Sequence, residues 1–131
     1  LEKWSTIQKK RKDIWDLYYD QLIDWSLTNN IVLPIVPKEC DQAYSMFYLI
    51  TSSSHNQNKI IKELSKNRVD AFFHYLPLHL SKMGKFYGSK QGDYPTTEII
   101  SETIVRLPFY ESLIQEDQKI VIKATKQINL D

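Results

Sequence analysis

The sequence has little of the chemistry that cross-links a chain, charges it or anchors it in a membrane. Among its 131 residues Cys40 is the one cysteine, which excludes an internal disulfide and a cysteine-based zinc site and fits a reducing cytoplasm. Lysine plus arginine (17) nearly balance aspartate plus glutamate (16), so no overall field favours nucleic acid or an anionic membrane. No apolar run approaches the roughly 20 residues of a membrane span, and no signal peptide is visible. We expect a soluble cytoplasmic protein without nucleic-acid or membrane partners.

The sequence also lacks a complete catalytic motif. There is no glycine-rich phosphate loop, no serine or cysteine with a base partner, and no pair of histidines one helical turn apart. We therefore assign no catalytic, cofactor-binding or metal-binding residue to this chain. With 42% hydrophobic and 25% charged residues, the composition is that of one folded globular domain.

The first 28 residues have the pattern of a long amphipathic helix. Apolar or aromatic residues recur at spacings of three and four, and Trp15 and Tyr19 widen the stripe beyond one face. A helix that bridges two domains has this pattern, so we expect Trp4, Trp15 and Tyr19 to be partly exposed in the isolated chain. The chain begins at Leu1 without an initiator methionine, and we expect a fragment of a longer protein.

Residues 29–131 alternate between helical and extended patterns. Strands are predicted by β-favouring residues and helices by three-to-four spacing, and Ser54 with Gln57 forms an expected capping box. This order indicates an α+β fold with a small, three-stranded, mainly antiparallel sheet packed with helices. The predicted strands are 44–51, 69–75 and 104–107, and the predicted helices are 54–67, 95–102 and 115–128.

The predicted strand 69–75 leads into a long loop at residues 78–94, which holds all three glycines of the chain. Loops of this length inside a compact domain are usually functional. His74 and Tyr75 end the strand, Pro77 fixes its direction, and His79 opens the loop, so either histidine is placed to move a proton or donate a hydrogen bond. The alternatives are a sheet histidine at 74, a core aromatic at 75 and a solvent-exposed loop histidine at 79.

Three segments resemble the DegT/StrS-type nucleotide-sugar aminotransferases. Residues 73–87 are similar to the family stretch with a Pro-Leu-His and a following tyrosine, residues 107–113 to its Leu-Pro-aromatic turn, and residues 9–22 to its interdomain helix. The His-Tyr-x-Pro-Leu-His form resembles most the transaminases that aminate C4 of a dTDP-4-keto-6-deoxyhexose to dTDP-4-amino-4,6-dideoxygalactose. Two departures from the family pattern are the residues at 81–84, in place of a glutamine-proline, and Ile114, in place of a serine or threonine cap.

The resemblance implies the C-terminal small domain of a fold-type I enzyme dependent on pyridoxal phosphate. Residues 1–28 would form the interdomain helix and residues 29–131 the small domain, and the large domain with the cofactor and its Schiff-base lysine would be missing, so the fragment alone should be inactive. The full-length enzyme would be a homodimer that moves an amino group, usually from glutamate, to a keto-deoxy nucleotide sugar for lipopolysaccharide or other cell-surface polysaccharide. The resemblance places four residues of this chain near that substrate: His74, Tyr75, His79 and Tyr87.

A second hypothesis makes the chain a stand-alone, non-catalytic binding module. Lys82, Lys85 and Lys90 lie in the long loop and could recognise a peptide or an anionic ligand. A reading frame that continues upstream into a lysine-bearing domain would favour the enzyme, and a start codon near Leu1 would favour the module.

Overall fold

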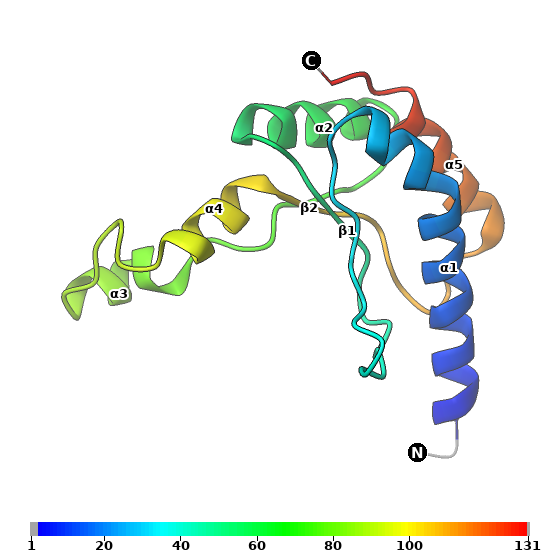
Figure 1. The fold of residues 1–131 in the computed structure, drawn as a ribbon, viewed down its shortest axis with the longest axis horizontal. Helices are drawn as coiled ribbons and strands as arrows, with labels where there is room; N and C mark the ends of the chain where they lie inside the picture. The colour runs from blue at the N-terminus through cyan, green and yellow to red at the C-terminus, as the bar shows by residue number, and fades with distance from the viewer. Residues whose placement is uncertain (1–2, 131) are drawn as a thin grey trace.

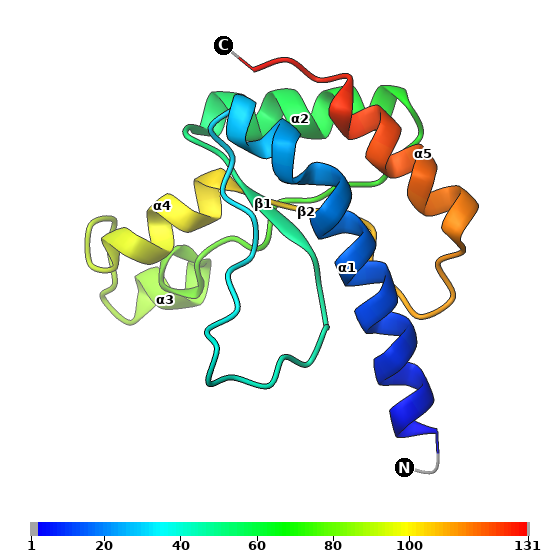
Figure 2. The same ribbon diagram turned by 45° about the vertical axis from the view of Figure 1, so that its right-hand side comes forward.

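The computed structural model describes residues 3–130. Figures 1 and 2 show that α1, α2 and α5 pack around the two strands, whereas η1, α3 and the start of α4 project to one side. We call the projecting residues 78–98 the arm and the rest the body. The elements are α1 (Trp4–Thr28), β1 (Tyr48–Ile50), α2 (Ser54–Lys66), η1 (Leu78–Leu80), α3 (Lys82–Phe86), α4 (Pro95–Thr103), β2 (Ile104–Arg106) and α5 (Gln115–Lys126).

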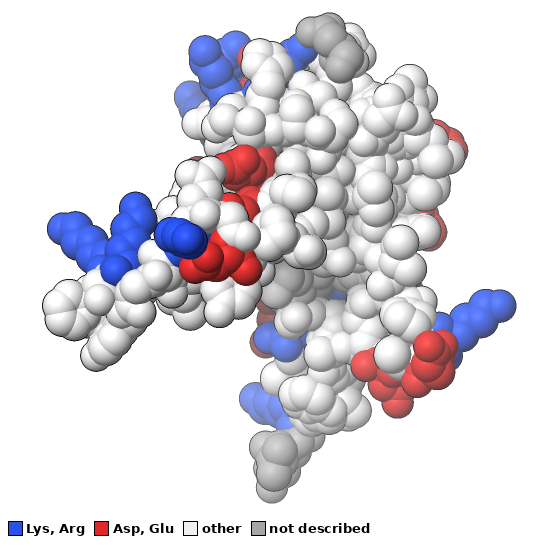
Figure 3. Space-filling view, turned by 60° about the vertical axis from the view of Figure 1, so that its left-hand side comes forward, with Lys and Arg blue, Asp and Glu red and all other residues white. Residues whose placement is uncertain are grey.

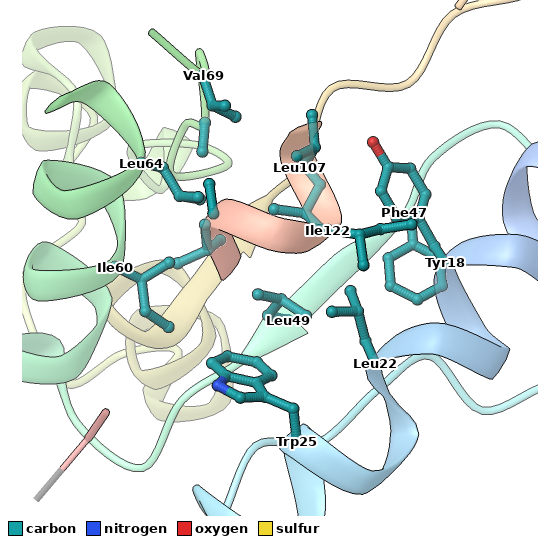
Figure 4. Close-up of a cluster of buried hydrophobic side chains, with 14 of the residues drawn as sticks. Tyr18, Leu22, Trp25, Phe47, Leu49, Ile60, Leu64, Val69, Leu107 and Ile122 are labelled. Carbon is teal, nitrogen blue, oxygen red and sulfur yellow. The ribbon is translucent and has the colours of Figure 1, made fainter. Parts of the chain in front are cut away.

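The hydrophobic core lies where α1, α2 and α5 meet the strands. Tyr18 and Leu22 of α1 and Leu49 of β1 are completely buried, and Figure 4 shows side chains from the three helices converging on those of β1. The Tyr18 hydroxyl donates a hydrogen bond to the Pro108 carbonyl (2.9 Å), and burial raises the pKa of Tyr18. Trp25 Nε1 donates to the Ile128 carbonyl (2.9 Å), which ties the end of the chain to α1. Apolar burial and these buried hydrogen bonds hold the body together.

Among residues 3–130 the sheet has two strands, so the expected third strand is not confirmed. β1 and β2 pair antiparallel, with Leu49 opposite Val105. The expected strand 69–75 meets β2 only at one bridge, between Phe72 and Arg106, and Val32 makes a similar bridge to Ile50 on the other side. The reason is the shortness of β2, because the chain turns away at Pro108, which has no N–H to extend a ladder.

Of the three aromatic residues of α1 that were expected to be partly exposed, Trp4 and Tyr19 are and Trp15 is not. Trp4 is 57% exposed, as expected, but Trp15 is 9% exposed and belongs to the core. Its ring stacks on Tyr19 (centroids 5.2 Å apart) and meets Phe47 edge-on (5.5 Å), which leaves Tyr19 half-buried. The second half of α1 therefore belongs to the core, since its apolar stripe packs against both Phe47, next to β1, and α5.

The start of α2 differs from the expected capping box. The cap is Ser53, whose side chain accepts a hydrogen bond from the Asn56 N–H (3.2 Å). Gln57 is buried, and its Nε2 donates to the carbonyls of Ser101 (3.0 Å) and Ile104 (2.8 Å). Gln57 thus fastens α2 to the end of α4 and the start of β2, a role that local sequence spacing does not reveal. Of the helices within residues 3–130, none has both the length and the apolar character required to cross a membrane.

Candidate functional site

Two hollows lie on either side of the segment 72–77, where the chain leaves the body for the arm. The Arg106 hollow has a volume of about 360 Å³ and the Gln57 hollow about 350 Å³. Phe73 and Tyr75 line both of them. The Arg106 hollow is completed mainly by the aromatic turn after β2, and the Gln57 hollow by α2 and α4. The segment 72–77 therefore separates the two hollows, and its residues Phe73 and Tyr75 border both of them.

His74 lies in the Arg106 hollow beside a permanent positive charge. Its Nδ1 is 3.4 Å from Arg106 Nη1, and its ring centroid is 3.8 Å from that of Tyr75. Partial burial first, and the Arg106 guanidinium second, lower the pKa of His74 below 6.5. Because a guanidinium can only donate, Nδ1 accepts and the proton of the neutral ring lies on Nε2. His74 can thus present a neutral N–H donor.

His79 is held by a carboxylate instead of facing solvent. Its Nε2 is 2.8 Å from Glu98 Oε1, and the two side chains are 9% and 14% exposed. The Tyr94 ring meets the imidazole edge-on, with centroids 4.8 Å apart. The hydrogen bond from His79 is the main cause that lowers the pKa of Glu98. The alternative of a solvent-exposed loop histidine was therefore wrong.

The four residues expected near a substrate do not converge on one hollow within this chain. His74 and Tyr75 lie together in the Arg106 hollow, whereas His79 belongs to the arm. Tyr87 is 78% exposed at the end of α3, where its ring contacts Phe86 (centroids 5.3 Å apart). The structure thus brings His74 and Tyr75 together, whereas His79 and Tyr87 lie in the arm.

Sequence reasoning missed two charged residues that organise this region. Arg106 is the one charged residue in the predicted strand 104–107. A charged residue in an apolar strand usually has a polar partner, so the sequence could have marked Arg106 as a candidate. Glu98 lies in the first turn of the predicted helix 95–102, where an acidic residue interacts favourably with the helix dipole, so its position suggested no further role. Its contact with His79, 19 positions away, has no local signature.

The surface around the arm is largely uncharged. Figure 3 shows white surface over most of this face, with basic side chains at the edge of the projecting part and acidic ones beside it. The arm exposes large apolar side chains, including Phe86 (79%) and Leu78 (86%). Lys82, Lys85 and Lys90 are also exposed. An exposed apolar surface of this kind is typical of a contact with another protein part.

Within residues 3–130 neither an enclosed lysine nor a cluster of metal-ligating side chains is found. None of the lysines in residues 3–130 is buried, whereas a lysine that forms a stable imine must be enclosed with its cofactor. No group of three or more histidine, cysteine, aspartate or glutamate side chains in the same range could hold a metal ion.

The architecture is that of a part of known aminotransferases. The chain is similar to the aminotransferase TlmJ from Streptoalloteichus hindustanus (TM-score 0.81, 22% identity), covering 95% of this chain and 32% of that one. It is likewise similar to Spr1654 from Streptococcus pneumoniae, solved in its PLP form (TM-score 0.82, 24% identity, 95% and 32% covered). These likenesses define the fold.

The sequence identifies the family. The chain belongs to the DegT/DnrJ/EryC1/StrS aminotransferase family, whose pattern it matches over residues 1–126. A curated relative is the uncharacterised protein MJ1066 of Methanocaldococcus jannaschii, 28% identical over 132 aligned residues, which cover 98% of this chain and 33% of the relative. The chain thus spans about a third of the length of the relatives that it matches.

Proposed function

We propose that this chain is the C-terminal small domain of an aminotransferase dependent on pyridoxal phosphate, and that the whole enzyme aminates a keto-deoxy nucleotide sugar. The observation that carries the proposal is the family match over residues 1–126, in a chain that spans about a third of its relatives. Spr1654, provisionally described as a sugar aminotransferase, supports both the sugar and the cofactor. Glutamate is the proposed amino donor and a dTDP-4-keto-6-deoxyhexose the proposed acceptor, for lipopolysaccharide or other cell-surface polysaccharide.

The proposal divides the work between two domains. Pyridoxal phosphate supplies an electron sink that makes amino transfer possible. Because no described lysine is buried and the chain spans about a third of its relatives, we assign the cofactor and its lysine to a large domain outside this chain. The fragment alone should then bind pyridoxal phosphate no better than free amines do. An absorbance band of an enclosed imine, lost on mutation of one lysine, would contradict this assignment.

This chain would contribute one wall of the substrate cleft. We assign residues 1–28 to the interdomain helix, whose exposed Trp4 would face the large domain, and residues 29–131 to the small domain. The exposed apolar side chains of the arm would be covered in the complete enzyme, which we propose to be a cytoplasmic homodimer. Covering them would exclude water from the cleft.

The four predicted site residues have distinct capabilities in this wall. The neutral His74 can donate from Nε2, and Tyr75, 66% exposed, offers a hydroxyl and an aromatic face. Tyr87 extends from the arm with the same two groups. His79 is directed by Glu98 and can present its remaining ring nitrogen. Hydroxyl and imidazole groups of this kind suit the oxygens of a sugar.

A comparison of the two half-reactions in the full-length enzyme tests the proposal. His79→Ala should lower kcat/KM for the nucleotide sugar about 10- to 100-fold, the usual scale of one lost positioning hydrogen bond. The half-reaction with the amino donor should change much less, because glutamate would be held by the large domain. Stopped-flow absorbance measures both.

The matched control is His55→Ala, which removes an exposed histidine at the start of α2. It should leave both half-reactions unchanged. Equal losses in both half-reactions of His79→Ala would mean that His79 supports the fold or the cofactor, and unchanged rates would remove it from the substrate site.

A further inference from the structure

The arm keeps a defined shape without a hydrophobic core. Every buried hydrophobic side chain among residues 3–130 lies in the body, and none lies within residues 78–98. Neither η1 nor α3 contains a buried residue. Because apolar burial cannot fix this segment, its shape must come from hydrogen bonds and close backbone packing.

The carboxylate of Glu98 joins three separate parts of the arm. Glu98 lies in the first turn of α4, and its Oε1 is 2.8 Å from His79 Nε2. The backbone N–H of Gly92 donates to both carboxylate oxygens, at 2.8 and 3.1 Å. A carboxylate that accepts several hydrogen bonds is strongly anchored, and charged acceptors make the stronger bonds. The lowered pKa of Glu98 agrees with this arrangement.

We propose that Glu98 is the positioning residue of the arm: its carboxylate closes residues 79–98 into a clasp that fixes the His79 imidazole. Because Nε2 of His79 is hydrogen-bonded to Glu98, the plane of the ring and the direction of its Nδ1 are fixed. Histidines whose one nitrogen is held by a carboxylate are oriented in the same way in other sites. Tyr94 packs against the same ring and restricts its rotation.

Two glycines are required for the clasp to close. A Cβ at Gly84 would lie 2.4 Å from the His79 carbonyl oxygen, so only glycine lets α3 approach η1 this closely. Gly92 has φ +93°, a conformation that side chains rarely adopt, and this conformation presents its N–H to Glu98. The loop sequence is therefore adapted to bring Gly92 and His79 to one carboxylate.

Limited trypsin digestion of the full-length protein tests the clasp without reference to activity. Lys82, Lys85 and Lys90 are exposed cleavage sites inside the clasp, so mass spectrometry of the fragments reports its opening. Glu98→Ala should speed cleavage at these lysines at least 10-fold. Glu98→Gln keeps the oxygen that accepts from His79 but loses the charge and the second oxygen, so its cleavage rate should lie between those of the wild type and the alanine variant, which also guards against simple misfolding of the alanine variant.

The matched control is Glu116→Ala. Glu116 is also an exposed acid in the first turn of a helix, but it belongs to α5, outside the arm. It should leave cleavage within the arm unchanged. Wild-type cleavage rates in Glu98→Ala, or equal acceleration in both alanine variants, would overturn the clasp.

The effect on catalysis rests on the proposed function. Glu98→Ala should lower kcat/KM for the nucleotide sugar by about as much as His79→Ala, and the double variant should lose no more than either single variant. If Glu98→Ala showed faster tryptic cleavage of the arm but an unchanged kcat/KM, the positioning role of Glu98 would be overturned. A wild-type protein without transaminase activity, but with arm cleavage accelerated in Glu98→Ala, would count against the proposed function and support the clasp.

Discussion

The body and the arm of this chain are built on different physical principles. The body buries aromatic and aliphatic side chains from α1, α2, α5 and both strands in one core. The arm buries no hydrophobic side chain and holds its shape through a carboxylate, backbone hydrogen bonds and tightly placed glycines. Many redundant contacts secure the body, whereas a few residues decide the geometry of the arm. The arm also exposes large apolar side chains, among them Leu78 and Phe86, and buries none.

The largest effect is expected when one core side chain of the body is truncated. Leu49→Ala should lower the free energy of unfolding by about 2 to 5 kcal/mol, the usual range for a fully buried leucine. Phe86→Ala, which truncates a larger side chain that is 79% exposed in the arm, should change it by less than about 0.5 kcal/mol. Urea denaturation followed by tryptophan fluorescence measures both. Similar losses would show that the arm shares in the cooperative core.

A smaller effect is expected at the joint between α2 and the end of α4, next to the arm. Gln57→Leu removes the Nε2 donor that serves the Ser101 and Ile104 carbonyls, and it should cost about 1 to 3 kcal/mol through unsatisfied buried acceptors. Asn58→Leu, the next residue on α2 and exposed, is the control. The same denaturation experiment applies, and a neutral Gln57→Leu would mean that the joint does not depend on these hydrogen bonds.

The smallest expected effect is the pH dependence that His74 contributes. Its folded-state pKa is lowered, so the unfolded chain binds the proton more readily and stability falls as pH drops below about 6.5. His74→Gln should therefore lose less stability than the wild type between pH 7.5 and pH 5.5. His55→Gln, at an exposed histidine of α2, should follow the wild type. A steeper loss in His74→Gln would contradict the direction of the shift.

Local patterns predicted the helices well because their signals lie within a few turns of chain. The spacing of apolar residues in the first 28 residues anticipated α1, and the order of the other main helices was also correct. The third strand was overpredicted because residues 69–75 have β-favouring side chains, but pairing requires a partner of sufficient length. β2 has three residues, and only Phe72 finds an opposite position. Trp15 was expected to be partly exposed because the width of an apolar stripe does not show how many elements cover it.

The sequence by itself determined the alternation of helices and extended segments and the resemblance to the aminotransferase family. These conclusions rest on local spacing and on motifs that are contiguous in the chain. Only the tertiary structure decided that Glu98 holds His79, that Arg106 faces His74, and that Gln57 joins α2 to α4. Each of these pairs is separated by 19 or more positions, and the partner of a polar side chain at such a distance depends on how the whole chain packs.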